Sequence, residues 1–176
     1  MNIIIEESKQ QALDLNTLKS HLRIDHEHED AYLKEVISMS TDILERNIEK
    51  PILEKTFKFI HYNAEYETTR PITLPMSNIR EIISVKKLVP GRSPEVLKYT
   101  LETHRDKTKV IVNGSKYPIE ITYKAGITRN IKHVPKDLQF AILQISKNIY
   151  ECSEEDVLES KYIKHIVNTH RTISLS

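Results

Sequence analysis

The chain has 176 residues, enough for one medium-sized domain or two small modules with a real core. Its 26 Lys and Arg residues nearly cancel its 25 Asp and Glu residues, which excludes a strong overall field for nucleic acid or an anionic membrane. The single cysteine, Cys152, excludes an internal disulfide framework and is typical of a reducing cytoplasm, and no apolar run approaches the roughly 20 residues that a membrane span needs.

The charge is unevenly distributed along the chain. Residues 1–50 hold 6 basic and 11 acidic side chains, residues 51–134 hold 15 and 8, and residues 135–176 hold 5 and 6. An acidic front and a basic middle can stack copies of the chain, acidic face on basic face. Solvated surfaces of uneven composition explain the same pattern, and both interpretations stay open.

The first 50 residues predict a flexible leader (1–13) and two helices (14–50). Asp14 is a suitable N-cap for a short helix with leucines at i, i+3 and i+7, namely Leu15, Leu18 and Leu22. A longer amphipathic helix is predicted from about Ala31 to Glu49, before Pro51.

Residues 51–130 predict an inserted β module, because the apolar period changes to two. Strands are predicted in TFKFIHY and at Ile82–Val89. TKVIVNGSKYPIEITYKAG predicts a hairpin that turns at Asn113-Gly114, with Pro118 marking an edge strand or a bulge.

Residues 131–176 predict two further helices, which complete a bundle and end in a partner-binding tail. Pro135 opens the first helix, and an amphipathic segment covers about Glu155–His170. The flanking helices are too short to be stable alone, so we expect them to pack on each other. The predicted fold class is α+β, a small helical bundle from the N- and C-terminal helices with an inserted antiparallel β module.

The stretch LKSHLRIDHEHEDAYLKEV (18–36) poses the question of a metal site. HEHED approaches the helical metalloprotease pattern, but Tyr32 stands where the second histidine of that pattern belongs. His26 and His28 could still bind a metal in a loop with outside ligands. The competing interpretation is a helix–linker–helix joint in which Glu29 and Asp30 cap the second helix.

Other chemistry finds little support in the residues. The three glycines form no phosphate loop, and the acidic neighbours of Cys152 argue against an activated thiolate there. A Ser/His/Asp arrangement stays open, because such residues meet only in space. Nucleic-acid binding is a further alternative, carried by basic residues of the β module near three tyrosines: Lys86, Lys87, Arg92, Arg105, Lys107 and Lys109, with Tyr99, Tyr117 and Tyr123.

Two phrases resemble a known family, the head–tail connector (adaptor) proteins of long-tailed double-stranded DNA bacteriophages, prophages and gene transfer agents. The first is a K-x-H-L-R-[IV]-D phrase after a leucine-started helix, followed by an acidic pair; it is carried by Lys19, His21, Leu22, Arg23, Ile24 and Asp25, then Glu29 and Asp30.

The second phrase is similar to a T-Y-x-A-G strand end followed by [VI]-P-x-D-[LI], which opens a helix closing in YE. It is carried by Thr122, Tyr123, Ala125, Gly126, Val134, Pro135, Asp137, Leu138, Tyr150 and Glu151. In the closing IVNTHRTISL, His170 stands where the family has a tyrosine, and Arg171 is kept.

The resemblance implies a structural protein without catalysis or cofactor. Such adaptors form a ring of about twelve copies below the portal, extend the DNA channel and dock a downstream head-completion or tail protein, without sequence-specific DNA binding and without a membrane. It implies assembly in the host bacterial cytoplasm and a final place at the virion head–tail junction.

Two sets of contact residues are hypothesised. For the contact between copies they are Asp30, Glu35, Asp42, Lys86, Lys87 and Arg92, acidic helix against basic β module. For the portal they are Tyr162, Ile163, Ile166, His170 and Arg171, because the C-terminal segment is short and needs a partner to bury its apolar face.

Overall fold

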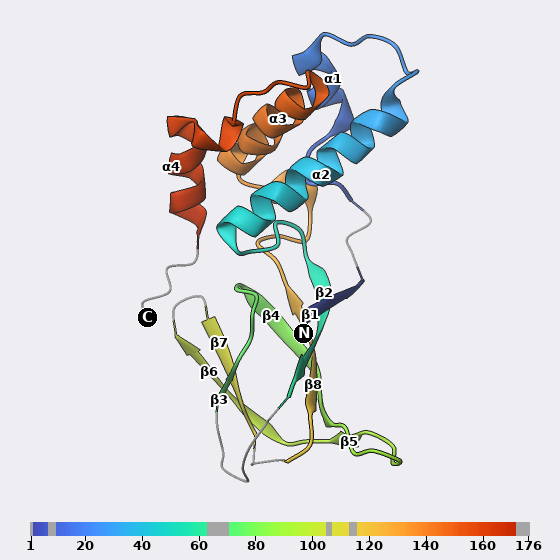
Figure 1. The fold of residues 1–176 in the computed structure, drawn as a ribbon, viewed down its shortest axis with the longest axis vertical. Helices are drawn as coiled ribbons and strands as arrows, with labels where there is room; N and C mark the ends of the chain where they lie inside the picture. The colour runs from blue at the N-terminus through green and yellow to red at the C-terminus, as the bar shows by residue number, and fades with distance from the viewer. Residues whose placement is uncertain (1, 7–9, 63–70, 105–106, 113–115, 172–176) are drawn as a thin grey trace. The chain divides into compact units, whose positions relative to one another are not determined.

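The computed structural model describes residues 2–6, 10–62, 71–104, 107–112 and 116–171, and it divides the chain into two compact units. The β unit comprises Met1–Glu7 and Glu54–Gly126, and the helical unit comprises Ser8–Leu53 and Ile127–Ser176 (Figure 1). Helices and antiparallel sheets together confirm the α+β class. Within the described residues, no helix is both long and apolar enough to cross a membrane.

The helical unit contains both predicted N-terminal helices. Asp14 caps the first one as predicted, accepting a hydrogen bond from the Thr17 N–H at 3.1 Å. That helix ends at Arg23, whose left-handed backbone (φ 59°) lets the Ile24 N–H reach the Lys19 carbonyl at 2.9 Å. The helices of the unit are α1 (Leu15–Leu22), α2 (Asp30–Ile48), α3 (Lys136–Tyr150) and α4 (Lys161–His170), with single 3₁₀ turns at Ile131–His133 and Val157–Glu159.

The core of the helical unit draws on all four helices. Leu18, Leu33, Ile142 and Ile163 represent α1 to α4 in it, and all four are buried. The predicted bundle of N- and C-terminal helices is therefore present.

A buried polar contact joins α2 to α3. Ser146 Oγ donates to Ser40 Oγ at 2.9 Å, and Ser40 Oγ donates to the Val36 carbonyl at 2.7 Å. Both serines are fully buried. Their small side chains let the two helices approach, and each hydroxyl is satisfied without water.

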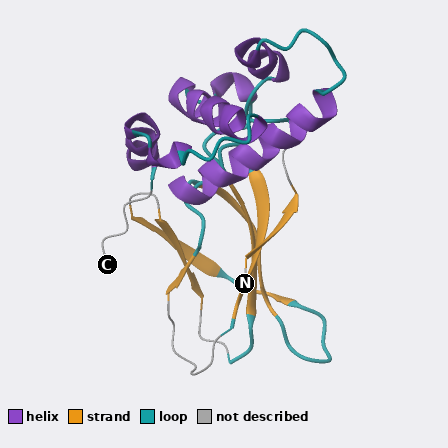
Figure 2. Ribbon diagram, turned by 45° about the horizontal axis from the view of Figure 1, so that its top comes forward, coloured by secondary structure: helices purple, strands orange, loops and turns teal. Residues whose placement is uncertain are grey.

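The β unit is built from two antiparallel sheets, drawn as orange strands in Figure 2. One sheet has the order β1 (Asn2–Glu6), β2 (Lys55–His61), β8 (Ile119–Ala125), β4 (Ile79–Lys87) and β5 (Glu95–Val96). The other has the order β3 (Pro71–Thr73), β7 (Lys107–Val112) and β6 (Tyr99–His104). Their apolar faces share one core, in which Phe57 stacks on Tyr123 with ring centroids 5.5 Å apart.

Two expectations about the chain's path are wrong. The leader (1–13) is not loosely held in its described parts: Asn2–Glu6 form β1 against β2, and Ala12 and Leu13 are buried in the helical core. Residues 1 and 7–9 of the leader lie outside the described residues. The expected hairpin does not form, because β7 and β8 lie in different sheets; its turn at Asn113-Gly114 falls outside the described residues.

The position of β8 explains the failed hairpin. Its alternating apolar residues pair with β2 on one side and with β4 on the other, so it is a central strand. Pro118 comes directly before it, where a missing N–H costs no ladder bond, and so marks neither an edge strand nor a bulge.

Candidate assembly surfaces

The stretch 18–36 is a joint between two helices. Lys19 near the end of α1 binds Asp30 at the start of α2, with Nζ and Oδ1 2.7 Å apart and the lysine side chain largely buried. At the same end of α2, Glu29 accepts a hydrogen bond from the Tyr150 hydroxyl at 2.8 Å. Residues of the two family-like phrases therefore meet here, one from α2 and one from the end of α3.

The predicted capping role of Glu29 is wrong in its detail. Glu29 occupies the N-cap position of α2, but its side chain makes no capping hydrogen bond. Its carboxylate is engaged by Tyr150 instead, and this hydrogen bond, with burial and the Glu29 charge, raises the pKa of the Tyr150 hydroxyl above its usual range.

The histidines of the joint are exposed. The rings of His26 and His28 lie 5.6 Å apart, and His21 points away from the leucine face of α1. Among the residues that the structure describes, no group of three or more His, Cys, Asp or Glu side chains is placed to hold a metal ion.

The five residues expected to contact a portal have mostly intramolecular partners. Ile163 and Ile166 are 1% and 8% exposed and pack into the helical core. His170 Nε2 lies 2.6 Å from Asp137 Oδ2, and Arg171 binds Glu49 at 3.0 Å. Tyr162, by contrast, is 77% exposed.

The contact between α4 and Asp137 perturbs that carboxyl group. Partial burial raises its pKa, but hydrogen bonds from His170 and from the Leu138 N–H, with the charge of His170, outweigh it. The pKa of Asp137 is therefore lowered, and its ionised form is favoured when α4 is docked.

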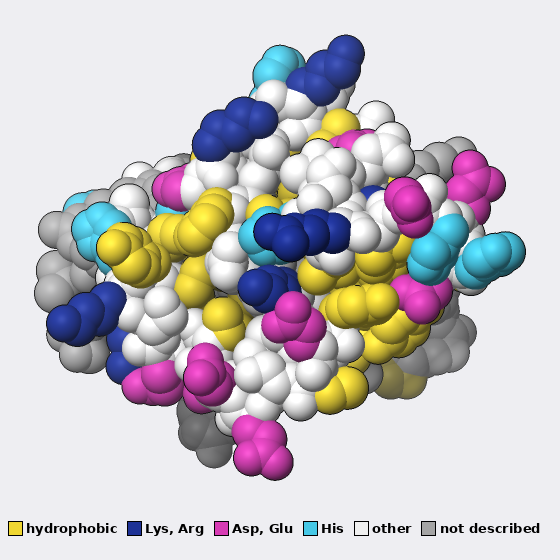
Figure 3. All heavy atoms as spheres, turned by 90° about the horizontal axis from the view of Figure 1, so that it is seen from above, with side chains coloured by type: hydrophobic (Ala, Val, Ile, Leu, Met, Phe, Trp, Pro, Cys, Tyr) yellow, Lys and Arg dark blue, Asp and Glu magenta, His cyan; other side chains and the backbone are white. Residues whose placement is uncertain are grey.

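The acidic residues proposed for self-contact differ in exposure. Asp30 is half-buried and binds Lys19, and Glu35 and Asp42 are exposed on α2. They alternate at helical spacing with Tyr32 and Met39, which are about half exposed, so one stripe of α2 carries both apolar and acidic side chains. Figure 3 shows hydrophobic (yellow) and acidic (magenta) side chains interspersed on the face seen from above.

The basic residues of the β unit are interleaved with acids. Lys87 binds Glu95 at 2.8 Å, and Lys86 stands opposite Glu120 in the ladder between β4 and β8. Arg92 is exposed in the turn between β4 and β5. Of the three, only Arg92 lies outside a strand.

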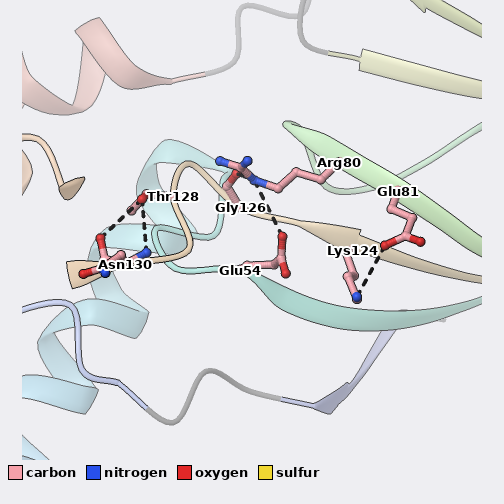
Figure 4. A network of polar contacts seen from close by, with 7 residues as sticks. All are labelled: Glu54, Arg80, Glu81, Lys124, Gly126, Thr128 and Asn130. Atoms are coloured by element: carbon pink, nitrogen blue, oxygen red, sulfur yellow. Dashed lines mark hydrogen bonds and ion pairs between the residues drawn. The ribbon is translucent and has the colours of Figure 1, made fainter. Parts of the chain in front are cut away.

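The same interleaving is seen where β8 ends. Lys124 binds Glu81 at 3.3 Å, while Arg80 Nε donates to the Gly126 carbonyl at 2.9 Å and lies 3.8 Å from Glu54 (Figure 4). These contacts hold the chain where β8 ends, and they pair Lys124 and Arg80 with carboxylates of the same unit.

The three tyrosines near the basic residues do not form one platform for bases. Tyr123 is fully buried against Phe57, Tyr117 is half-buried and Tyr99 is partly exposed on β6. Arg105, one of the proposed basic residues, falls outside the described residues.

Strand β6 is absent from the elements predicted above, and all six of its residues are exposed. Its segment YTLETH alternates Tyr99, Leu101 and Thr103 with polar residues, a period-two signal that could have found the strand. Because Glu102 and His104 make the segment polar overall, its alternation is weak in the sequence.

The model of the phage gp6-like head–tail connector protein family matches residues 12–87. This range contains the first family-like phrase, at Lys19–Asp30, and so confirms the resemblance there; the second phrase lies outside it. A search of curated proteins finds no match.

Solved structures match over the full length. A chain of the neck of an empty gene transfer agent (GTA) particle, computed with C6 symmetry, has a TM-score of 0.81 at 16% identity. A chain of the virion of a native GTA particle has 0.81 at 15%, and one of the native GTA neck computed with C12 symmetry has 0.76 at 16%. Each match covers 100% of this chain and 97% of the other, so the likeness extends over the entire fold.

Proposed function

We propose that this chain is a structural subunit of the head–tail connector of a phage or phage-like particle. The observation that carries the proposal is the match of residues 12–87 to the connector family. The full-length likeness to chains of gene transfer agent particles supports it independently, because that likeness includes the β unit beyond residue 87.

The positions of the family-like side chains support a structural role without catalysis. Lys19, Glu29, Asp137 and Tyr150 each bind a partner that joins two helices of the same unit. These contacts hold α1, α2, α3 and α4 together. In this proposal the four side chains therefore stabilise the fold and do not act on a substrate.

We further propose that copies of the chain form a ring, of about twelve subunits as in adaptors of this kind. The likeness to particle necks computed with C6 and C12 symmetry supports a cyclic arrangement. A ring needs two different surfaces on each copy, one for each neighbour. The acidic stripe of α2, with Glu35 and Asp42, and the basic turn around Arg92 are complementary candidates.

The C-terminal helix is the proposed contact with a portal. Tyr162 is available on the surface, whereas Ile163 and Ile166 can reach a partner only if α4 leaves the helical core. That movement would also break the contacts of His170 with Asp137 and of Arg171 with Glu49. In this proposal the subunit assembles in the host cytoplasm, joins the head–tail junction and docks a tail component while DNA passes through the ring.

Negative-stain imaging of the purified chain, alone and mixed with a portal of the same element, tests the proposal. Closed rings, or density added below the portal, are expected. Single particles in both samples, with portals unchanged, would contradict it.

Charge reversal tests the proposed self-contact. Arg92→Glu should weaken ring formation more than Lys87→Glu, because Lys87 is already engaged by Glu95. Lys132→Glu, an exposed lysine of the helical unit, controls for the change in net charge. Equal ring yield from Arg92→Glu and Lys132→Glu would reject this face.

A further inference from the structure

Within the described residues of the β unit, the edge strand β6 continues an apolar face that is left partly exposed. Among the described residues β6 pairs with β7 alone, and no register shift interrupts the six pairs. Leu101 stands opposite Val110, and Tyr99 opposite Val112, so these side chains share a face. The valines are buried, whereas Leu101 is 48% and Tyr99 is 38% exposed.

Most sheet edges carry a feature that prevents pairing, and the edges of this unit differ in that respect. β3 has three residues and begins at Pro71, and β5 has two residues. β6 has six residues without proline, lysine or a bulge. It therefore presents a row of main-chain donors and acceptors to which another strand can add.

A matching edge lies at β1. This strand ends the five-stranded sheet, and Figure 1 shows it on the opposite side of the β unit from β6. It is regularly paired over Asn2–Ile4, and its bulged residue Ile5 is half exposed. Two different edges on opposite sides of one unit suit a head-to-tail contact, which can close into a ring.

The charges favour one direction of pairing. Every strand pair within the two sheets is antiparallel. An antiparallel addition would bring the acidic last residue of β1, Glu6, to the start of β6, which follows the exposed Lys98. A parallel addition would leave Lys98 beside the uncharged start of β1.

From these observations we propose that β6 of one copy pairs antiparallel with β1 of the next copy. The pairing joins the three-stranded sheet of one subunit to the five-stranded sheet of its neighbour and covers Leu101 and Tyr99. This inference rests on the proposed function, since it adds a main-chain pairing to the charged contact proposed between copies in the ring.

Zero-length carbodiimide crosslinking tests the pairing. Unlabelled and ¹⁵N-labelled full-length chains are mixed, assembled and treated, and the crosslinked peptides are analysed by mass spectrometry. An amide between Lys98 of one isotope and Glu6 of the other is expected, and the mixed isotopes show that it formed between copies. Lys98→Arg should remove this peptide while rings still form.

A matched pair of variants tests the energetic role of the edge. Leu101→Lys places a charge on β6, and Ile83→Lys places one at an equally exposed (48%) apolar position on β4. Leu101→Lys should raise the concentration needed for assembly by about tenfold or more, and Ile83→Lys should leave it nearly unchanged. Thermal unfolding of both should match wild type, since neither side chain is buried.

The outcomes separate this inference from the proposed function. Rings that lack the mixed crosslink, or in which the two lysine variants assemble alike, would overturn the β6–β1 pairing and leave the connector role standing. Crosslinked open chains without closed rings would support the pairing and contradict the ring. A wild-type chain that stays monomeric at every concentration would overturn the pairing.

Discussion

The C-terminal helix of the helical unit and the edge strand β6 of the β unit place their aliphatic side chains in opposite ways. Helix α4 buries Ile163 and Ile166 in the helical core, and the contacts of His170 with Asp137 and of Arg171 with Glu49 hold its C-terminal end. In the β unit a six-residue edge strand leaves Leu101 and Tyr99 uncovered. The residues that make the sequence resemble a connector are therefore mainly those that close the helical unit, whereas the proposed contact between copies uses residues with no such signature.

The largest expected effect is on the free energy of unfolding, where a substitution in the helical core is compared with one at the edge strand β6. Ile142→Ala removes a fully buried side chain from the helical core and should lower the free energy of unfolding by about 2–5 kcal/mol. Leu101→Ala, at the edge, should change it by no more than about 0.5 kcal/mol. Urea unfolding of the full chain measures both, and equal losses would show that β6 is already covered within the monomer.

The contact between α2 and α3 tests how closely the core of the helical unit is packed. Ser40→Val inserts bulk where Ser40 meets Ser146 and should cost about 1–3 kcal/mol. Ser38→Val, on the exposed side of the same helix, is the control. If thermal unfolding of the two variants coincided, the helices would not be packed as closely as the serine contact implies.

Ion pairs of the two units should differ as well. Lys19→Gln breaks a largely buried pair with Asp30 and should cost about 1.5 kcal/mol. Lys124→Gln breaks the exposed pair with Glu81 on the sheet and should cost about 0.5 kcal/mol or less. Denaturant midpoints at low and high salt measure these costs, and the Lys124 pair alone should lose its contribution in salt.

The smallest effect concerns the docking of α4 at low pH. Because the folded-state pKa of Asp137 is lowered, its contribution is present above the unfolded value of about 3.9 and is lost as the pH falls through the folded value. Hydrogen exchange of α4 should therefore accelerate in that acidic window, and Asp137→Asn should remove the pH dependence. An unchanged acid profile in Asp137→Asn would assign the effect to another group.

Helices were predictable from the sequence because their apolar period reports directly on a buried face. The helix ends depend on local residues as well: Asp14 caps α1, and α2 ends before Pro51, both as predicted. A period of two, by contrast, identifies a strand without naming its neighbours. Asn113-Gly114 indicated a hairpin, yet the faces of β8 are better satisfied between β2 and β4.

The candidate contact residues were harder to predict for a related reason. Charge alone does not reveal that Asp30 is already bound by Lys19, or Lys87 by Glu95. The apolar stripe of the C-terminal segment predicts a partner-binding face. In the structure Ile163 and Ile166 of this stripe pack into the core that α3 forms with Leu138, Ala141 and Ile142. Both facts depend on distant parts of the chain meeting in space.

Hydrogen–deuterium exchange of the free chain and of the assembled ring tests the central claim most directly. The account predicts that main-chain amides of β6 and β1 gain protection on assembly, while those at the joint of α1, α2 and α3 are already protected in the free chain and stay unchanged. Protection gained at that joint, with β6 exchanging as in the free chain, would contradict it.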